Sequence, residues 1–195
     1  MYNFIGKYIR NKALKKYKPN KDASFKNIND VSIIGFTYKI ETSAMAADLL
    51  CIVEKLKEHN LNYRGAVVVQ SKQLINSALD AKGLQQDFLD NITILPPSDI
   101  TFFREPKKGV LDSFYSHNYD LFFNFNAMDS ITLDCIVIGA KINYLVGMKN
   151  SSLIPNNMVL LGEKGVVLSN VEFFNQALHY LNVIECPTQQ DYNEE

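Results

Sequence analysis

The chain has 195 residues, of which 47% are hydrophobic and 21% charged, a balance that excludes a fibrous or disordered protein and allows one full hydrophobic core. No apolar run reaches the roughly 18 to 20 residues that cross a bilayer, and the N-terminus lacks the pattern of a secretory signal, so we expect a cytoplasmic protein. The net charge of −1 hides an asymmetry, because residues 1–21 carry seven basic residues and no acid, which leaves 13 basic against 21 acidic residues elsewhere.

The basic residues at the N-terminus form the first recognisable segment, the basic arm (residues 1–21). Its apolar residues Phe4, Ile5, Tyr8 and Ile9 recur at helical spacing among cations, which predicts a basic amphipathic helix. Charge split between two parts of a chain often marks contact with a polyanion, since neutralised phosphates release counterions. RNA or an anionic membrane surface would suit residues 1–18, and the candidate polyanion-binding residues are Lys7, Arg10, Lys12, Lys15, Lys16 and Lys18. Alternatively, the apolar stripe packs on the domain, or the charges serve self-association or solvation.

A strand, a helix and a second strand follow the arm. The apolar run VSIIGF (31–36) is rich in β-branched residues and predicts a buried strand. The next segment, TSAMAADLLCIVEKLKEHN (42–60), offers Thr42 or Ser43 as an N-cap, one apolar face, and Asn60 as a stop, which together predict a helix. With the strand YRGAVVVQ (63–70), this order is typical of a parallel βαβ unit.

The middle of the chain predicts a helix between Gln73 and Asp90, then the strand NITIL (91–95), which Pro96 and Pro97 end. DITFF (99–103) is predicted either as a further sheet strand or as an extension of that one. A second βαβ unit follows. It comprises the strand YDLFFNF (119–125), a helix capped by Asp129 or Ser130 that ends near Gly139, and the strand INYLVG (142–147).

Near the C-terminus, MVLL and VVLS flank GEKG and predict a hairpin. Ser169 stands three residues before Glu172 in a capping box, which predicts a last helix. We therefore expect one three-layer, Rossmann-like α/β domain (22–186) with a mostly parallel sheet, between the basic arm and an acidic tail (187–195). The strands at 31–36, 64–70, 119–125 and 142–146 should be parallel neighbours.

Two resemblances accompany these elements. The order of YDLFFNFN, a helix and AKINYLVGM, after DITFF and LDSF and a basic N-terminal arm, resembles an uncharacterised family of small cytoplasmic proteins of Bacteroidota bacteria, a domain of unknown function. That resemblance spans most of the chain and implies an α/β domain without catalytic residues. YDLFFNFNAMDSITLDCIVIGAKINYLVGM also resembles the acceptor-side half of heptosyltransferase-like glycosyltransferases. Such enzymes need two Rossmann-like halves, and this chain is long enough for one.

Motifs that carry chemistry are absent: the sequence has no phosphate loop, dinucleotide fingerprint, nucleophile elbow or zinc-protease motif. This absence favours a non-catalytic protein and predicts no cofactor and no metal site. We expect His59 and His179 to meet the last carbonyls of helices. Cys51 and Cys135, in helical patterns, are expected to be small buried hydrophobes, and Cys186 completes an odd set without CxxC spacing.

A small ligand, if one binds, would lie beyond the carboxyl ends of the strands, where the strand order reverses. The candidate ligand-binding residues follow the predicted strands. They are four cations that could bind an anion, two amides that could donate hydrogen bonds, and one acid: Lys39, Lys72, Arg104, Lys149, Asn124, Asn126 and Asp129. The alternative is that the lysines keep the loops solvated while Asn124 and Asn126 shape the turn and cap the helix.

Two functions remain open at this point. The first is a non-catalytic binding or adaptor module whose basic arm contacts a polyanion. The second is a degenerate or single-domain transferase-like enzyme that binds a phosphorylated small molecule. An exposed, charged pocket at the strand ends would favour the enzyme, whereas a positive surface formed by the arm would favour the binding module.

Overall fold

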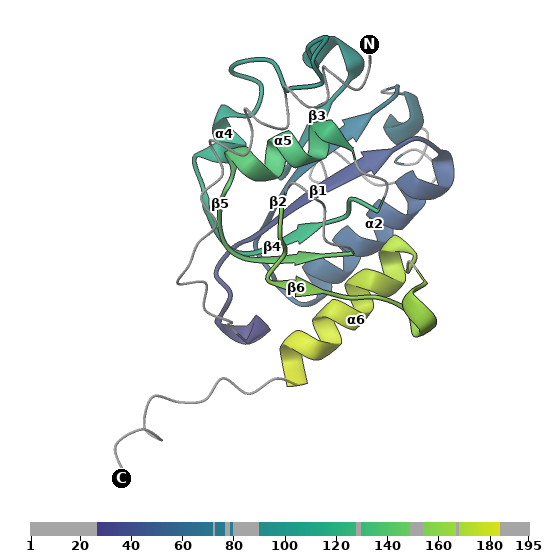
Figure 1. Cartoon of the computed structure of the whole chain (residues 1–195), viewed down its shortest axis with the longest axis vertical. Coiled ribbons are helices and arrows are strands. Elements are labelled where there is room, and N and C mark those ends of the chain that lie inside the picture. The colour runs from purple at the N-terminus through teal and green to yellow at the C-terminus, as the bar shows by residue number, and fades with distance from the viewer. Residues whose placement is uncertain are drawn as a thin grey trace.

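The computed structural model describes residues 27–71, 73–76, 79, 90–127, 130–148, 154–166 and 168–183. Within them six strands form one sheet in the order β3-β2-β1-β4-β5-β6, and every neighbouring pair is parallel (Figure 1). The strands are β1 (Ile34–Ile40), β2 (Tyr63–Val69), β3 (Ile92–Leu95), β4 (Asn118–Asn124), β5 (Lys141–Gly147) and β6 (Met158–Val159). The helices are η1 (Ile28–Asp30), α2 (Ser43–Glu58), η3 (Pro97–Asp99), α4 (Asp112–Tyr115), α5 (Ile131–Gly139), η4 (Glu163–Gly165) and α6 (Asn170–Val183).

The strand order confirms the predicted fold class. The four strands expected to be parallel neighbours are β2, β1, β4 and β5, and they lie side by side in that order. The order 3-2-1-4-5-6 is that of the doubly wound Rossmann-like sheet, whose direction of winding reverses between β1 and β4. Proteins with this fold bind their ligands beyond the carboxyl ends of the two strands at the reversal, which here are β1 and β4.

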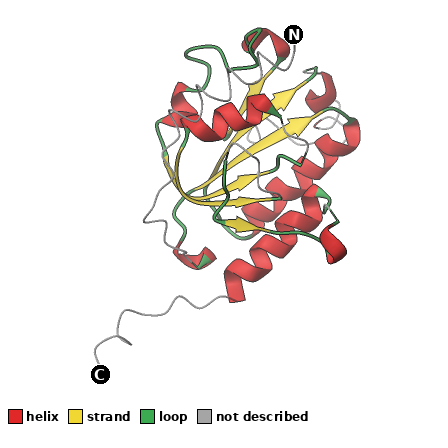
Figure 2. Cartoon of the chain, in the orientation of Figure 1, coloured by secondary structure: helices red, strands yellow, loops and turns green. Residues whose placement is uncertain are grey.

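Helices cover both faces of the sheet and make three layers (Figure 2). One core fills the space between the sheet and helices α2 and α6, and a second lies between the sheet and α4 and α5. Phe123 and Phe125 of the β4 segment pack edge to face on Phe173 and Phe174 of α6, with ring centroids 5.2 to 5.3 Å apart in the two closest pairs. Buried aromatic pairs of this geometry fix the helix on the sheet.

Gly35 in β1 marks the closest approach in the second core. A Cβ atom at this position would lie 2.4 Å from the ring of Phe122 and 2.7 Å from that of Tyr119. The missing side chain therefore lets both aromatic rings of β4 lie close against the backbone of β1.

The helix ends follow the predicted capping residues. Thr42 accepts a hydrogen bond from Met45 N–H at the start of α2. At its end, Asn60 adopts a left-handed conformation with φ of 54°, which stops the helix. The capping box of α6 is confirmed, because Ser169 Oγ accepts from Glu172 N–H at 3.3 Å and Glu172 Oε2 accepts from Ser169 N–H at 2.9 Å. The Ser169 hydroxyl and backbone N–H both donate hydrogen bonds to the carboxylate of Glu172. These bonds hold the pKa of Glu172 below its usual range.

Three predictions were wrong in detail. β1 is Ile34–Ile40 rather than 31–36, so Lys39 lies inside the strand, where it forms an ion pair with Glu41. The segment DITFF is not a strand, because Pro97 starts the short helix η3 and the chain then closes a tight loop through an Ile100–Pro106 bridge. The expected hairpin around GEKG is instead the parallel edge strand β6 followed by η4.

Several predicted segments lie outside the described residues: the basic arm, the acidic tail and most of the helix expected between Gln73 and Asp90. Gln73–Asn76 and Leu79 of that helix are helical. In the described part of the chain, no helix combines the length and apolarity needed to span a membrane.

Candidate functional site

The buried polar residues of the described chain gather at the carboxyl end of β4, at the middle of β1 beside it, and in the first turn of α5. They are Thr37, Asn124, Asn126, Thr132 and Asp134, here named the polar cluster. This position coincides with the place where the sheet reverses its winding, and ligands of such folds bind there. We therefore treat the polar cluster as the candidate site.

Thr37 and Asn124 form one half of the polar cluster. The two residues are register partners in the parallel pair β1 and β4. Thr37 Oγ1 donates a hydrogen bond to Asn124 Oδ1 at 3.1 Å, and both side chains are buried. A buried hydroxyl or amide without a partner costs free energy, so this bond is what lets two polar side chains lie inside the sheet.

Asn126 forms the other half and organises the start of α5. Its Oδ1 accepts from Ser130 N–H at 2.8 Å, and its Nδ2 donates to Asp134 Oδ1 at 2.9 Å. Ser130 is the N-cap of α5 and accepts from Leu133 N–H. Both ends of the Asn126 amide are thus engaged in holding the loop after β4 to the helix. Asn126 therefore shapes the turn before α5, as the alternative prediction has it, whereas the cap of the helix is Ser130 and Asn124 bonds Thr37 within the sheet.

Of the other predicted ligand-binding residues, Lys39 lies two residues beyond Thr37 in β1 and Arg104 lies apart from the polar cluster. Lys39 pairs with Glu41 at 2.6 Å, and each side chain is about one-third exposed. Arg104 is exposed in the loop after β3, which β2 and β1 separate from β4 in the sheet. Lys72, Asp129 and Lys149 lie outside the described residues, as do the candidate polyanion-binding residues of the arm. Sequence analysis missed Thr37, Thr132 and Asp134, although a threonine and an acid within the apolar helix ITLDCIVIG were a readable signal.

The arrangement can hold a loop and a helix in place, and it contains no titratable dyad suited to acid–base catalysis. Among the residues that the structure describes, no group of three His, Cys, Asp or Glu side chains could hold a metal ion. His59 sits at the C-cap of α2, in keeping with its predicted place at a helix end. Cys51 and Cys135 lie in α2 and α5 and are only half-buried, so they are less enclosed than expected.

A family model described as a family of unknown function, DUF6913, matches residues 3–184. The chain belongs to DUF6913. No match to a curated protein was found. The match covers the whole described sheet and confirms the predicted resemblance to an uncharacterised family, while the likeness to glycosyltransferases stays a prediction. Because DUF6913 is a family of unknown function, membership assigns no activity to the polar cluster.

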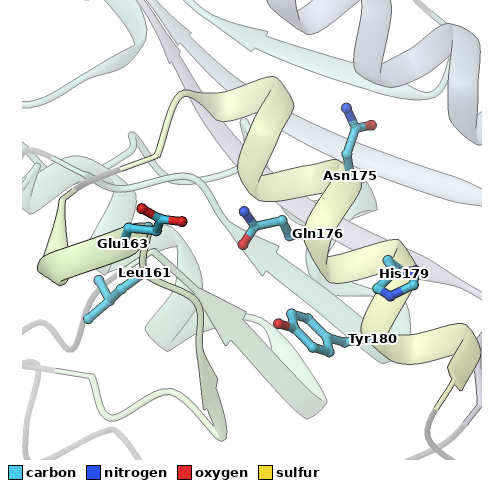
Figure 3. A pocket seen from close by; sticks show the side chains of 7 residues that line it. Leu161, Glu163, Asn175, Gln176, His179 and Tyr180 are labelled. Carbon is cyan, nitrogen blue, oxygen red and sulfur yellow. The ribbon is translucent and has the colours of Figure 1, made fainter.

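A shallow groove lies on a different face of this DUF6913 chain, between α6 and the segment that follows β6 (Figure 3). Its volume is about 540 Å³, and its lining residues are Leu161, Gly162, Glu163, Asn175, Gln176, His179 and Tyr180. His179 lies about one turn before the end of α6 and contacts Tyr180 edge to face, with ring centroids 5.7 Å apart. The groove is wide open and gathers no set of like charges, so it does not point to a ligand class.

The loop after β3 is the second unusual feature of this DUF6913 chain. Thr101 N–H donates to Glu105 O at 2.8 Å and Arg104 N–H donates to Thr101 O at 2.9 Å, which closes a tight turn of five residues. Phe102 and Phe103 stand at its tip with their rings exposed to solvent. We name Thr101–Lys108 the aromatic loop.

Proposed function

We propose that the chain is a non-catalytic binding module that docks on an anionic partner surface through its basic arm. The observation that carries the proposal is that Thr37, Asn124 and Asn126 of the polar cluster form hydrogen bonds within the fold. In an enzyme of this fold, polar groups at the reversal of the strand order face a substrate. Here Asn126 uses both ends of its amide on α5, Thr37 bonds Asn124, and Lys39 is paired with Glu41.

The charge distribution supports the same proposal. The seven cations of residues 1–21 have no acid among them, so nothing within the arm compensates their charge. A cationic segment of this kind gains free energy on a phosphate-rich surface by releasing counterions. RNA and an anionic membrane both present such a surface.

The test compares three proteins: the wild type, a deletion of residues 1–18, and a variant with the six cations of residues 1–18 replaced by glutamine. The glutamine variant keeps the apolar residues of the arm, so it separates the loss of charge from the loss of packing. We expect both variants to lose co-sedimentation with anionic vesicles or single-stranded RNA while keeping the melting temperature of the wild type. Binding by the wild type should fall with salt, with a log-log slope of about −0.7 to −0.9 per phosphate contact.

A matched control replaces two exposed lysines of the domain, Lys57 and Lys141, with glutamine. This control should bind as the wild type does. The proposal fails if the wild type binds neither vesicles nor RNA, or if deleting the arm lowers the melting temperature and leaves binding intact.

A second candidate function rests on the strand order. The 3-2-1-4-5-6 sheet and the location of the polar cluster at its reversal favour a degenerate transferase-like enzyme that binds a phosphorylated small molecule. Thermal-shift measurements with nucleotide sugars and sugar phosphates, on the wild type and on the Asn124→Ala/Asn126→Ala variant, separate the two functions. Stabilisation of the wild type by such a compound, lost from the double variant, would favour the enzyme.

A further inference from the structure

Two adjacent phenylalanines project from the aromatic loop into solvent. Phe102 is 85% exposed and Phe103 is 47% exposed, and no other large hydrophobic side chain in the described chain is as exposed as Phe102. Their rings contact each other edge to face, with centroids 5.6 Å apart and planes at 80°. Exposed apolar side chains are common singly, but two neighbouring aromatic rings at the tip of one loop mark an interaction site.

Hydrogen bonds within the aromatic loop brace this tip. Besides the two bonds that close the turn, Lys107 N–H donates to Asp99 O at 2.8 Å, and Thr101 Oγ1 accepts from Glu105 N–H at 3.2 Å. Arg104 adopts a left-handed conformation with φ of 62°. Glycine or asparagine is usual at that position of such a turn, so the chain accepts strain to keep an arginine there.

The exposed charged side chains of the aromatic loop are cations, although the half-buried acid Glu105 lies among them. Between Pro97 and Leu111 the exposed charged side chains are Arg104, Lys107 and Lys108, whereas Asp99 and Glu105 are half-buried. The chain beyond residue 21 is acidic, with 13 basic against 21 acidic residues. The aromatic loop is therefore a local cationic and apolar projection on an acidic domain, and its charge complements an anionic partner.

We infer that the aromatic loop inserts Phe102 and Phe103 into the interface of an anionic lipid bilayer, with Arg104, Lys107 and Lys108 on the headgroups. This inference rests on the proposed function and selects one of its two partner classes. A bilayer interface accepts apolar side chains in any orientation and attracts the flanking cations. Stacking of successive RNA bases needs neighbouring rings with roughly parallel open faces, whereas the planes of these two rings stand at 80° to each other.

The sequence offers a direct probe because it contains no tryptophan. In the full-length Phe102→Trp variant the introduced indole is therefore the only one in the protein. On addition of phosphatidylcholine vesicles containing phosphatidylserine, we expect a blue shift of its emission and quenching by bromine placed in the acyl chains. Pure phosphatidylcholine vesicles should give a much weaker response.

Three further variants measure how much each part contributes to vesicle binding. Phe102→Ala/Phe103→Ala should weaken binding roughly tenfold or more, since two apolar side chains no longer leave water. Replacing Arg104, Lys107 and Lys108 with glutamine should weaken it by about fivefold per cation. The matched control, Tyr180→Ala/Val183→Ala, removes two exposed apolar side chains of α6 and should change binding less than twofold.

Each outcome decides between the two proposals. If the wild type binds anionic vesicles while the introduced indole gives no response and the double alanine variant binds equally well, the loop inference is overturned and the proposed function stays intact. Binding to RNA alone, with the emission of the Phe102→Trp variant quenched but not blue-shifted, replaces insertion with stacking on bases. Failure of the wild type to bind either vesicles or RNA removes both proposals.

Discussion

Replacing Asn126 with alanine should lower the free energy of unfolding by about 2 to 4.5 kcal/mol, the sum of two lost hydrogen bonds. The substitution removes the bond that Asn126 Oδ1 accepts from Ser130 N–H, and loss of an intramolecular hydrogen bond costs about 0.5 to 1.5 kcal/mol. It also removes the bond from Asn126 Nδ2 to Asp134 Oδ1, and a hydrogen bond to a charged group contributes about 1.5 to 3 kcal/mol. Urea unfolding followed by circular dichroism measures the change through the transition midpoint at constant slope.

Asn126→Asp is the informative companion. It keeps an oxygen that can accept from Ser130 N–H, but it replaces the donor by a carboxylate facing the carboxylate of Asp134. Two carboxylates in one buried place cannot both ionise easily, so the pKa of the pair should rise in the folded protein. When the pKa of a carboxyl group is raised in the folded state, the protein loses stability as the pH rises above the pKa of that group in the unfolded chain, which is near 4.

The Asn126→Asp variant should therefore be less stable than Asn126→Ala at neutral pH, and its deficit relative to the wild type should shrink toward about pH 4. The reasoning is refuted if Asn126→Ala costs less than about 0.5 kcal/mol, because loss of one buried hydrogen bond alone should cost at least that much. If the free energy of unfolding of Asn126→Asp falls short of the wild type by the same amount at neutral pH and at about pH 4, the two carboxylates do not lie close together.

Three further expectations concern single positions. Gly35→Ala should lower stability by about 1 to 3 kcal/mol in the same urea assay, because its Cβ would lie 2.4 Å from the ring of Phe122, and an unchanged midpoint would contradict this contact. Arg104→Gly should raise stability by up to about 1 kcal/mol by relieving the left-handed strain, yet weaken binding to anionic vesicles. Ser169→Ala should raise the pKa of Glu172 toward its ordinary value in a carbon-13 NMR titration, because it removes the hydroxyl that helps the backbone N–H to hold this pKa low. An unchanged pKa would show that the capping box contributes little.

The central sheet could be predicted from the sequence because its strands are apolar runs separated by segments with helical spacing. The end of β1 could not be predicted in this way. Thr37 and Tyr38 look like the start of a polar loop, and their partners come from far along the chain: Asn124 bonds Thr37, and Asn170 donates to Tyr38 Oη at 2.8 Å. A strand that carries polar groups is recognisable only when those partners are known.

Only part of the polar cluster could be predicted from the sequence. The rule for ligands in parallel sheets pointed to the residues after several strands, and of those residues Asn124 and Asn126 lie in the polar cluster. Asp134 was not predicted because a single acid in an apolar helix usually faces solvent, whereas here Asn126 meets it inside the fold. The aromatic loop was missed for another reason: two phenylalanines normally indicate a buried strand, and neighbouring prolines do not reveal that a tight turn points them outward.

The basic arm and the aromatic loop would act on one membrane in different physical ways. The described chain begins at Asn27, whose side chain bonds Asn182 O near the end of α6, while the loop follows β3, so the two features start from different parts of the domain (Figure 1). A segment of 26 residues spans at most about 90 Å when extended, which allows both to reach the same surface. Attraction between exposed charges is screened over about 10 Å at 0.1 M salt, whereas burial of apolar surface is not. Loss of the arm should therefore matter most at low salt, while loss of the two phenylalanines should reduce binding by a similar factor at every salt concentration.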